Sequence, residues 1–494
     1  MFEVPERFNA GTLVDRNLEA GRGAKVAIRC AGEELTYAEL HERICAAGNV
    51  LEALGVGRED RVLMILDDSP TFVALFLGAM RIGAVPAPVS FLDTTENFRH
   101  YARDSYARVV IAEDAIVERV DGAIPRTEFE AAMRDHGGET DPVDTHRDDM
   151  AFWLFSGGST GFPKGVVHLH HDIPYTCETF AREILQIAEQ DVTFSSTKLY
   201  HAYGLGNNLT FPYWVGATTV LRAGRPDPRG LLETAQASRP SLFFSVPTLY
   251  GAMVNLPDAQ EHDLSSVRMC VSAAEPLAPE ILRRWRATFG LDIVDGIGST
   301  EMLHIYCSNR PGDVRPGTSG TPVSGYELTL LDEHDRPVGA GEVGNLHVKG
   351  DSALAYYWHQ HEKTRRALHG DLFFTGDRYR ETEDGYFVYE GRADDMIKIG
   401  GLWASPIEIE NVLVEHPRVL EAAAIGVDAD YTTRVKAFVV CRGDAGDETL
   451  IADLQAWCKQ RLRRYEYPHF IDFVEELPKT PTGKIQRYKL REPA

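Results

Sequence analysis

Hydrophobic and polar positions in the first half of the chain switch repeatedly between helical and extended spacing. Apolar residues recur at helical intervals over residues 37–54 and 71–81, which predicts two helices. Short apolar runs at 61–66, 84–89 and 109–112 have the length of buried strands. Such alternation predicts an α/β fold with helices layered on a largely parallel sheet. Further strands are expected at 152–155, 218–221, 242–245 and 267–272.

The pattern changes after Gly317 to shorter strands separated by turn residues. Runs at 326–332, 344–349 and 385–389 predict an antiparallel β element. We therefore expect a large N-terminal domain of residues 1–393, built of several subdomains with layered sheets and a β subdomain.

A second, small α+β domain is expected over residues 394–494. A compact pattern begins after the sequence GRADD at 391–395, and about 100 residues of this kind are enough for a separate domain. Its helices are expected at 406–415 and 450–464, and its strands at 422–427 and 435–441.

The charge balance excludes two classes of partner. The 51 Lys and Arg residues against 74 Asp and Glu residues give a net charge of -23, which repels nucleic acid and acidic membrane surfaces. The longest apolar stretch, residues 71–91, contains Arg81, Pro86 and Pro88 and falls short of the ~18 uncharged residues that a membrane span needs. We therefore expect no nucleic-acid partner and no membrane partner.

The N-terminus and the cysteines indicate a cytoplasmic protein. The sequence MFEVPERFN has acidic residues and a proline where a signal peptide has basic and then apolar residues. The 7 cysteines include no C-x-x-C pair, which fits neither a disulfide framework nor a zinc site. Reduced thiols in a cytoplasmic protein are expected.

A glycine- and hydroxyl-rich segment, SGGSTGFPKG at 156–165, follows the apolar run FWLF. Backbone N–H groups and hydroxyls of such a loop can surround phosphate oxygens, and Lys164 adds a positive charge. The segment is not a Walker loop, because no GK[ST] sequence occurs in the chain. A phosphate loop is therefore predicted, with a flexible surface turn as the simpler alternative.

The same glycines also satisfy the G-x-S-x-G nucleophile elbow of a serine hydrolase, over residues 157–161. An elbow runs directly into a helix, whereas Pro163 and Gly165 oppose helix formation here. No partner histidine and aspartate are evident further along the chain. The serine hydrolase stays open as a remote alternative.

Three more segments carry candidate chemistry. In DGIGSTE at 295–301, Thr300 offers a hydroxyl to phosphate and Glu301 a hard oxygen of the kind that Mg²⁺ prefers; a buried turn capped by Thr300 is the alternative. Asp377, in a tight turn, could hold a ribose diol together with Arg392. The basic turn PTGKIQR at 481–487 is either a solvated tail or the site of a lysine that contacts polyphosphate.

These four segments, in this order, resemble the adenylate-forming superfamily of acyl-CoA synthetases, peptide-synthetase adenylation domains and luciferases. The resemblance covers nearly the whole chain. The tracts KLYHAYGLGN at 198–207 and GIGSTEMLHIYCSNRPGDVRPGTSG at 296–320 are most similar to benzoate-CoA ligases and related aryl-CoA ligases.

The resemblance implies an AMP-forming ligase that uses ATP, Mg²⁺ and coenzyme A. An aryl carboxylate, either benzoate or a hydroxy-, amino- or halobenzoate, would first form an aryl-adenylate with release of pyrophosphate. The thiol of coenzyme A would then displace AMP and give a thioester. Loading of an acyl-carrier protein is the alternative second step.

The resemblance also assigns roles to residues of this chain. Thr300 would contact the α-phosphate, Glu301 would bind Mg²⁺, and Lys484 would bridge the acyl carboxylate and the α-phosphate. Asp394 would be the hinge of a mobile C-terminal domain. The remaining ATP-binding positions would be Ser156, Gly157, Gly158, Ser159, Thr160, Gly161, Lys164, Asp295, Asp377 and Arg392.

The acyl and thiol sites follow in the same way. His201 would gate the coenzyme A tunnel, which Gly400 and Gly401 would line. His201 stands where benzoate ligases usually have phenylalanine. This difference argues against benzoate as the sole substrate, so a hydroxy-, amino- or halobenzoate is expected nearly as much as benzoate. Ile297 replaces a tyrosine that stacks on adenine in many relatives but matches the aryl-CoA ligases. The acyl pocket would comprise Ala202, Tyr203, Gly204, Ser272, Ala273, Gly296, Ile297, Gly298 and His304. His304 could reach a ring substituent, and a core histidine bonded to backbone is the alternative.

Overall fold

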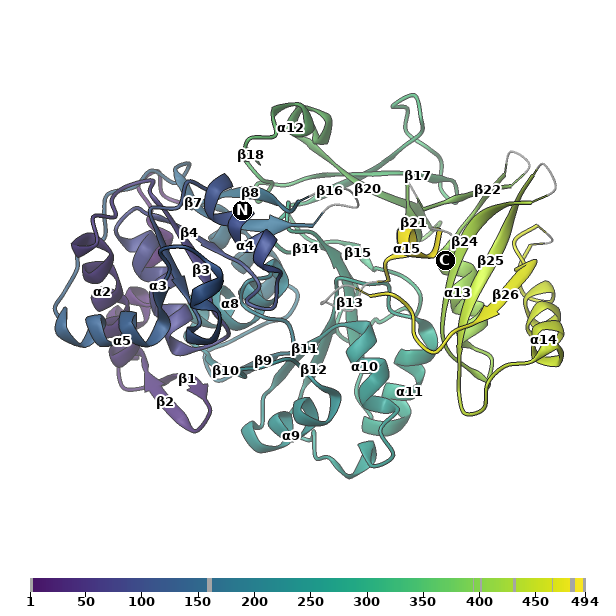
Figure 1. Ribbon diagram of the computed structural model, residues 1–494, viewed down its shortest axis with the longest axis horizontal. Coiled ribbons are helices and arrows are strands. Elements are labelled where there is room, and N and C mark those ends of the chain that lie inside the picture. Colours follow the sequence, from purple (N-terminus) through teal and green to yellow (C-terminus); the bar gives the residue numbers. More distant parts are fainter. Residues whose placement is uncertain are drawn as a thin grey trace.

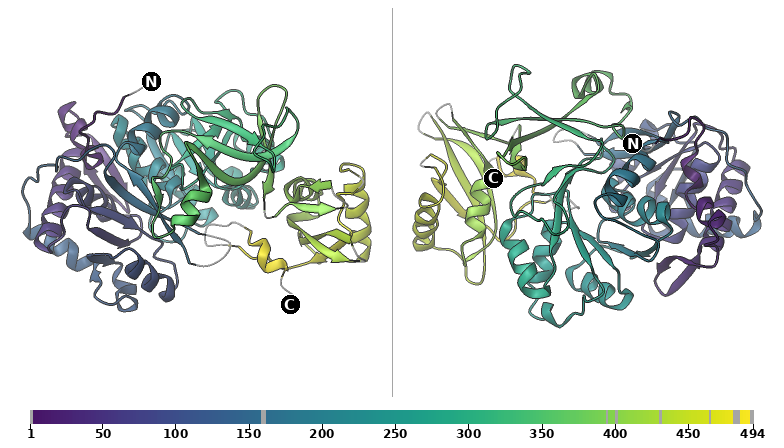
Figure 2. Two further views of the ribbon diagram at one scale, coloured as in Figure 1. Left: turned by 90° about the horizontal axis from the view of Figure 1, so that it is seen from above. Right: turned by 180° about the vertical axis from the view of Figure 1, so that it is seen from behind.

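The protein is described from a computed structural model that covers residues 3–157, 162–393, 395–399, 402–429, 432–463, 465–479 and 485–491. Helices and sheets of the N-terminal region form a large layered body, and the elements from α13 to α15 form a smaller lobe beside it (Figure 1). The views from above and from behind show the same division (Figure 2). The mixed α/β architecture with layered sheets that the sequence predicts is confirmed.

A parallel four-stranded sheet occupies the N-terminal part of the large body. Its strands, in spatial order, are β4 (Val85–Pro88), β3 (Arg61–Ile65), β5 (Val109–Ala112) and β6 (Ile124–Pro125). Helix α3 begins at Pro70 after Ser69, whose hydroxyl accepts a hydrogen bond from the N–H of Phe72 at 3.2 Å. The other helical segments here are η1 (Ala10–Thr12), α1 (Asp15–Glu19), α2 (Tyr37–Ala53), α3 (Pro70–Arg81), α4 (Thr95–Asp104), η2 (Asp114–Arg119) and α5 (Arg126–Asp135).

A nine-stranded sheet forms the second layer. Its central strands pair in parallel, as the continuous apolar runs predict, whereas β2, β14 and β15 add antiparallel edges. The order is β15 (Thr321–Pro322), β14 (Ile305–Ser308), β13 (Ile293–Gly298), β12 (Met269–Ser272), β11 (Leu242–Ser245), β9 (Val192–Ser195), β10 (Thr218–Leu221), β1 (Val26–Cys30) and β2 (Glu33–Thr36).

Helical segments connect these strands. Those between residues 172 and 289 are α6 (Asp172–Thr176), η3 (Cys177–Arg182), α7 (Ala202–Leu205), η4 (Gly206–Thr210), α8 (Phe211–Val215), α9 (Pro228–Ser238), α10 (Pro247–Val254), η5 (Ala259–Glu261) and α11 (Pro279–Phe289).

A third, antiparallel sheet pairs two strands from the middle of the large body's sequence with one strand near its end. It consists of β7 (Met150–Ser156), β8 (Lys164–Leu169) and β18 (Tyr356–Tyr357). Ser156 lies opposite Lys164 in the β7–β8 pair, so the predicted phosphate loop connects two strands of a hairpin. The strand β8 was not among the predicted elements.

The antiparallel β element expected beyond Gly317 is present as a five-stranded sheet. It contains β16 (Glu327–Leu331), β17 (Val343–Lys349), β20 (Leu372–Glu381), β19 (Leu368–His369) and β21 (Phe387–Arg392), and α12 (His361–Ala367) precedes β19.

The C-terminal lobe combines a three-stranded sheet with helices. The helix expected over 450–464 is shorter than predicted, because its last turn closes at Gln460 and the chain then turns away. The elements of the lobe are β22 (Ile397–Ile399), β23 (Leu402–Ala404), α13 (Pro406–Val414), β24 (Val419–Ala429), β25 (Thr432–Cys441), α14 (Glu448–Lys459), β26 (Phe470–Phe473) and α15 (Arg487–Arg491).

A polar contact beside β25 joins the lobe to the large body. The guanidinium of Arg442 donates a hydrogen bond from Nη1 to Oδ1 of Asn255 at 2.9 Å, just beyond the end of α10. Arg442 also donates from Nε to the carbonyl of Val419 at 2.8 Å, which fixes its base within the lobe.

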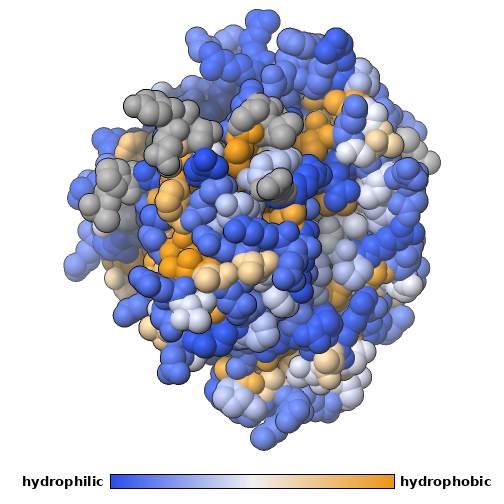
Figure 3. Space-filling model, turned by 90° about the vertical axis from the view of Figure 1, so that its right-hand side faces the viewer, coloured by the Kyte–Doolittle hydropathy of each residue, from blue (hydrophilic) through white to orange (hydrophobic). Residues whose placement is uncertain are grey.

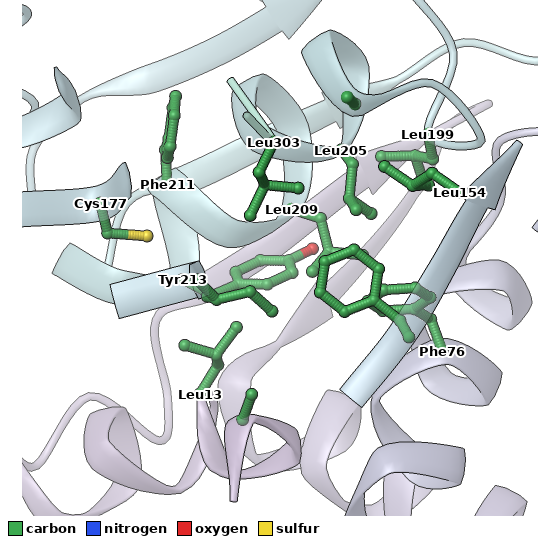
Figure 4. Close-up of a cluster of buried hydrophobic side chains, with 14 of the residues drawn as sticks. Leu13, Phe76, Leu154, Cys177, Leu199, Leu205, Leu209, Phe211, Tyr213 and Leu303 are labelled. Atoms are coloured by element: carbon green, nitrogen blue, oxygen red, sulfur yellow. The ribbon is translucent and has the colours of Figure 1, made fainter. Parts of the chain in front are cut away.

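The core brings the segment that contains α7, η4 and α8 against the N-terminal elements. Leu205 and Leu209 of this segment lie beside Phe76 of α3 and Leu303 in a close-up of the cluster (Figure 4). All of these side chains are buried. Packing of this kind fixes the position of the tract that the sequence assigns to the acyl pocket.

The surface agrees with the acidic composition. The face that presents the C-terminal lobe is mostly hydrophilic, with hydrophobic residues in small separate groups (Figure 3). Within the described residues, no helix has both the length and the apolar character that a bilayer crossing requires. All 7 cysteines are free thiols; Cys441 is half-buried and the others are buried.

Candidate active site

The segment DGIGSTE ends a central strand of the nine-stranded sheet. β13 runs to Gly298, and the chain then turns through residues 299–304 before β14 begins. A Cβ atom at Gly298 would lie 2.4 Å from the carbonyl oxygen of His304, so only glycine fits where the chain folds back on itself. The turn therefore lies at the carboxyl end of parallel strands, where α/β sheets bind ligands.

The predicted phosphate loop and this turn meet through two charged side chains. Nζ of Lys164, at the start of β8, lies 3.3 Å from Oε1 of Glu301. The same ammonium lies 3.7 Å from the ring centroid of Tyr357 on β18. The Tyr357 hydroxyl donates a hydrogen bond to Glu301 Oε1 at 3.0 Å. The fold thus brings together two residues that the sequence assigns to one polyphosphate and its metal ion.

Burial and pairing set the charges of this cluster. Burial alone would raise the pKa of Glu301, but Lys164 and the Tyr357 hydroxyl hold it below its usual value. Burial lowers the pKa of Lys164, and Glu301 opposes that shift. Burial and the neighbouring Glu301 raise the pKa of Tyr357. An ionised, buried carboxylate is a hard oxygen donor, which fits Mg²⁺.

The hairpin geometry excludes the nucleophile elbow. The segment after residue 161 enters the strand β8, and Ser156 and Lys164 face each other across the β7–β8 pair. An elbow requires a strand followed by a helix. The serine-hydrolase alternative is therefore wrong for this segment. In the second segment the cap is Ser299, whose hydroxyl accepts a hydrogen bond from the N–H of Met302 at 3.2 Å, and not Thr300.

Asp295 provides a buried carboxylate beside the turn. It lies opposite Ser272 in the β12–β13 pair and is 7% exposed. Its Oδ1 atom has no hydrogen-bond partner within the described residues. Burial raises the pKa of this carboxyl well above its usual value. A buried acceptor without a partner is suited to an amine donor such as that of adenine.

His304 lies in an aromatic cage at the end of the turn. Its ring centroid is 4.5 Å from that of Phe211, 5.3 Å from Phe180 and 5.5 Å from Tyr203. Nε2 donates a hydrogen bond to the carbonyl of Tyr203 at 3.3 Å, whereas Nδ1 is buried without a partner within the described residues. Burial lowers the pKa of His304 to about 3. The ring is therefore neutral, and Nδ1 presents a lone pair.

The other predicted acyl-pocket residues lie close to His304 or on neighbouring strands. Ala202, Tyr203 and Gly204 lie in α7, and all three residues are buried. The hydroxyl of Tyr203 donates to the carbonyl of Val271 at 3.0 Å, which turns its ring toward the cage. The remaining predicted wall residues lie on or next to the strands β12 and β13: Ser272, Ala273, Gly296, Ile297 and Gly298.

Asp377 and Arg392 form a pair on the β subdomain. They lie opposite each other in the β20–β21 pair, and Arg392 Nη1 is 3.2 Å from Asp377 Oδ1. Arg392 also donates to the carbonyl of Thr375 at 3.2 Å. The preceding Gly376 has a φ of 76°, and a Cβ atom there would lie 2.8 Å from the guanidinium. The carboxylate and the guanidinium are therefore already oriented in one cluster.

A buried ion network, which the sequence analysis missed, fixes the tract that carries His201. Lys198 donates from Nζ to Asp67 Oδ1 at 2.8 Å and to the carbonyl of Arg222 at 2.6 Å. Asp68 accepts a hydrogen bond from the N–H of Leu199 at 2.9 Å. The His201 ring packs edge-on against Tyr200, with centroids 4.7 Å apart. This network connects the tract to the loop after β3.

Part of the predicted site lies outside the described residues. These positions are Gly158, Ser159, Thr160, Gly161, Asp394, Gly400, Gly401 and Lys484. The interpretation of the C-terminal segment as a solvated basic tail is wrong for Arg487. Its side chain is 12% exposed and donates to Glu410 at 2.7 Å, and Arg491 donates to Asp395 at 2.7 Å.

Comparison with known proteins places the chain in a class. Residues 15–358 match the family model described as AMP-binding enzyme, and residues 408–484 match the AMP-binding enzyme C-terminal domain. The chain belongs to this family, as the resemblance predicted.

Particular relatives and structures agree with this membership. The chain is 45% identical to a benzoate-CoA ligase of Thauera aromatica, with 99% of this chain and 97% of that protein covered. It superposes with a TM-score of 0.95 on the anthranilate CoA ligase AuaEII in complex with anthranoyl-AMP, at 37% identity, with 99% and 97% of the two chains covered. A benzoate CoA ligase from Burkholderia xenovorans LB400 gives a TM-score of 0.92 at 42% identity, with 98% and 100% covered.

Proposed function

We propose that this enzyme activates an aromatic carboxylic acid with ATP and transfers the acyl group to coenzyme A. The carboxylate attacks the α-phosphorus of ATP to give an aryl-adenylate and pyrophosphate, and the thiol then displaces AMP. The observation that carries the proposal is the convergence of Lys164, Glu301, Asp295 and His304 on one turn at the end of β13. This turn would hold the phosphates, the metal ion, the adenine and the ring of the acid.

The first half-reaction needs positive charge at the phosphates. Lys164 and Ser156, on the two strands of the hairpin, would hold the β- and γ-phosphates together with the loop between them. Thr300 would donate to the α-phosphate. Mg²⁺, when held by Glu301 and the phosphates, supplies positive charge that stabilises the pyrophosphate leaving group.

The nucleoside and the second half-reaction involve residues in both lobes. Asp377 would accept hydrogen bonds from the ribose hydroxyls with Arg392 beside it, and Asp295 would accept one from the adenine amine. By resemblance, Lys484 would serve the first half-reaction, and Asp394 would be the hinge between an N-terminal domain of 1–393 and a mobile domain of 394–494. His201, Gly400 and Gly401 would line the thiol tunnel.

The chemistry of His304 favours a substituted ring. Nε2–H is donated to the Tyr203 carbonyl, so the unpaired Nδ1 atom accepts and does not donate. A hydroxy- or aminobenzoate supplies the matching N–H or O–H, whereas benzoate and halobenzoates do not. We therefore rank hydroxy- and aminobenzoates above benzoate and halobenzoates as substrates.

The test is pyrophosphate release by the purified enzyme with ATP, Mg²⁺ and a panel of aryl acids. Release that depends on both ATP and an aryl acid is expected, with a hydroxy- or aminobenzoate giving the highest kcat/KM. Release with ATP and long-chain fatty acids but not with aryl acids would overturn the aryl assignment. An absence of acid-dependent release would overturn the proposed chemistry altogether.

Adding an acceptor separates the two versions of the second step. With coenzyme A, mass spectrometry should detect an aryl-CoA thioester and AMP. If the adenylate persists with coenzyme A and is consumed only by a phosphopantetheinylated carrier protein, the acceptor is the carrier protein.

The free thiols support the expected cytoplasmic location, since reduced cysteines are usual there.

A further inference from the structure

The strand β8 contacts the catalytic turn through two side chains. Residues 164 and 168 lie four positions apart on the strand, so their side chains point to the same face. Lys164 approaches the Glu301 carboxylate, and His168 Nε2 lies 2.8 Å from the backbone carbonyl oxygen of Thr300. The first contact belongs to the proposed phosphate site. The second has no role in the function proposed above.

His168 is completely enclosed and is held from its other side by an acid. Nδ1 of His168 lies 2.7 Å from Oδ2 of Asp172, and both side chains are 0% exposed. The same carboxylate oxygen accepts a hydrogen bond from the N–H of Leu169 at 3.1 Å. The ring stacks on Phe152, with centroids 5.2 Å apart and planes at 20°. These contacts hold the imidazole ring in a single orientation.

Both ring nitrogens of His168 face acceptor oxygens. A carbonyl oxygen can only accept, so Nε2 must carry a proton. The bond at Nδ1 needs a second proton, either on the ring or on the Asp172 carboxyl. His171 Nε2, 3.1 Å from Asp172 Oδ1, is the other titratable group that faces this carboxyl.

The turn is fixed at three consecutive carbonyl groups. The carbonyl of Glu301 accepts from the N–H of Leu354 at 2.7 Å, and that of Met302 accepts from the hydroxyl of Ser352 at 2.8 Å. His168 provides the donor for Thr300, at the position between the predicted α-phosphate ligand and the predicted metal ligand. The Thr300 carbonyl also accepts from the N–H of Leu303 at 3.2 Å, so loss of His168 would remove the shorter of the two hydrogen bonds that this carbonyl makes with the described residues.

We infer that His168 and Asp172 form a positioning pair for the adenylation step. By holding the Thr300 carbonyl, the pair fixes the direction of the Thr300 hydroxyl and of the Glu301 carboxylate. His168 touches no reacting atom, so its effect passes through the turn. The inference rests on the proposed function, because it assigns the turn to MgATP. A displacement of ~1 Å at such a site lowers the rate ~100-fold.

Substitutions of His168 separate positioning from packing. His168→Met fills the space but removes the Nε2 donor and the Nδ1 contact with Asp172, whereas His168→Gln keeps an N–H₂ group near the position of Nε2. We expect His168→Met to lower kcat for pyrophosphate release ~30–100-fold and to raise the free Mg²⁺ needed for half-maximal rate ~5-fold or more. KM for the aryl acid should change less than ~3-fold. His168→Gln should recover at least ~10-fold in kcat.

A matched control lies two residues further along the chain. His170 is 1% exposed, and its Nδ1 accepts a hydrogen bond from the N–H of Ala10 at 3.0 Å, away from the turn. His170→Gln should leave the Mg²⁺ requirement within ~2-fold of the wild type. Misfolding of a variant would lower the amount of active enzyme but would not shift this Mg²⁺ requirement. An unchanged requirement in His168→Met, or an equal shift in His170→Gln, would overturn the inference.

A binding measurement keeps the inference separate from the choice of substrate. The melting temperature of each variant is measured at increasing MgATP concentrations, without an aryl acid. Half-maximal stabilisation of His168→Met should need ~5-fold more MgATP than that of the wild type, and Asp172→Asn should behave similarly. Equal titrations would overturn the positioning role, whatever the enzyme's activity. A wild type that binds MgATP but releases no pyrophosphate with aryl acids would instead overturn the proposed function.

Discussion

The ion pair between Lys164 and Glu301 should contribute strongly to the free energy of unfolding, and the substitution Glu301→Gln tests this. The charged atoms are 3.3 Å apart, and the two side chains are 15% and 11% exposed. At this distance an effective dielectric constant of about 20 gives an attraction of about 5 kcal/mol. The substitution leaves the Lys164 ammonium buried without its carboxylate, which typically costs about 3–5 kcal/mol. We expect Glu301→Gln to lower the free energy of unfolding by about 2–4 kcal/mol, because both groups keep some contact with water.

A double-mutant cycle with Lys164→Met measures the coupling. Each single variant leaves one charge buried alone, whereas the double variant leaves neither. The two losses should therefore not add, and a coupling energy of about 1–3 kcal/mol is expected from urea unfolding followed by tryptophan fluorescence. Trp153, which is fully buried on the strand paired with β8, reports on this region.

The pH dependence gives a second check. The pKa of Glu301 lies below its usual value of 4.5, so its contribution to stability is complete above pH 4.5 and is lost as the pH falls through the lowered value. The difference between the wild type and Glu301→Gln should shrink in acid. Glu362→Gln is the control, since this carboxylate is 86% exposed and 3.7 Å from Arg366; it should cost less than about 0.5 kcal/mol. Additive losses, or a difference that grows in acid, would refute the reasoning.

Four further predictions address the mechanism, the substrate and stability. Lys484→Ala should lower adenylation ~10²–10³-fold but largely spare thioester formation from a synthetic aryl-adenylate; equal losses in both assays would make the residue structural. Asp394→Pro fixes φ near about -65° and should slow the thioester step far more than adenylation in the same two assays; unchanged kinetics would place the hinge elsewhere. Aryl acids should exceed octanoate more than ~10-fold in kcat/KM, and His304→Ala should narrow the gap between a hydroxybenzoate and benzoate by about 1–2 kcal/mol; an unchanged gap would remove His304 from the pocket. Burial raises the pKa of Asp68 to about 7, so the contribution of this group to stability is complete below pH 3.8 and is lost as the pH rises toward 7. The melting temperature of the wild type minus that of Asp68→Asn should therefore fall over this range, and a constant difference would contradict this.

Much of the fold could be predicted because buried parallel strands are continuous apolar runs. The runs at 109–112, 218–221 and 242–245 coincide with β5, β10 and β11. The strand β8 was missed because the turn residues Pro163 and Gly165 obscure its start. Its short, mostly apolar run GVVHL at 165–169 indicated a strand, but the segment was assigned to the loop.

Some residues of the site could likewise be predicted from the sequence, and others could not. Lys164 and Glu301 stand out because charged residues in glycine-rich segments have few structural reasons to be there. Tyr357 and His168 could not be found from local sequence. His168 meets Thr300 only because β8 packs against the turn after β13, and the contacts of Tyr357 depend on the pairing of β18 with β8. Tyr357 lies opposite Val166 in that pair, and nothing in the spacing along the chain specifies this register.

The distribution of thiols offers a direct test of the proposed rotation of the lobe. Cys441 is the half-buried cysteine, and it precedes Arg442, whose guanidinium reaches Asn255 in the large body. Burial raises the pKa of Cys270 to about 12, and the pKa values of Cys177 and Cys307 are also raised, so these enclosed thiols react slowly with maleimides. Burial would raise the pKa of Cys45, but its hydrogen bond with His41 holds that pKa below its usual value, so a Cys45→Ala variant would direct an environment-sensitive dye to the half-buried Cys441. Its emission would change whenever the lobe leaves Asn255, which allows each turnover to be followed by stopped-flow fluorescence.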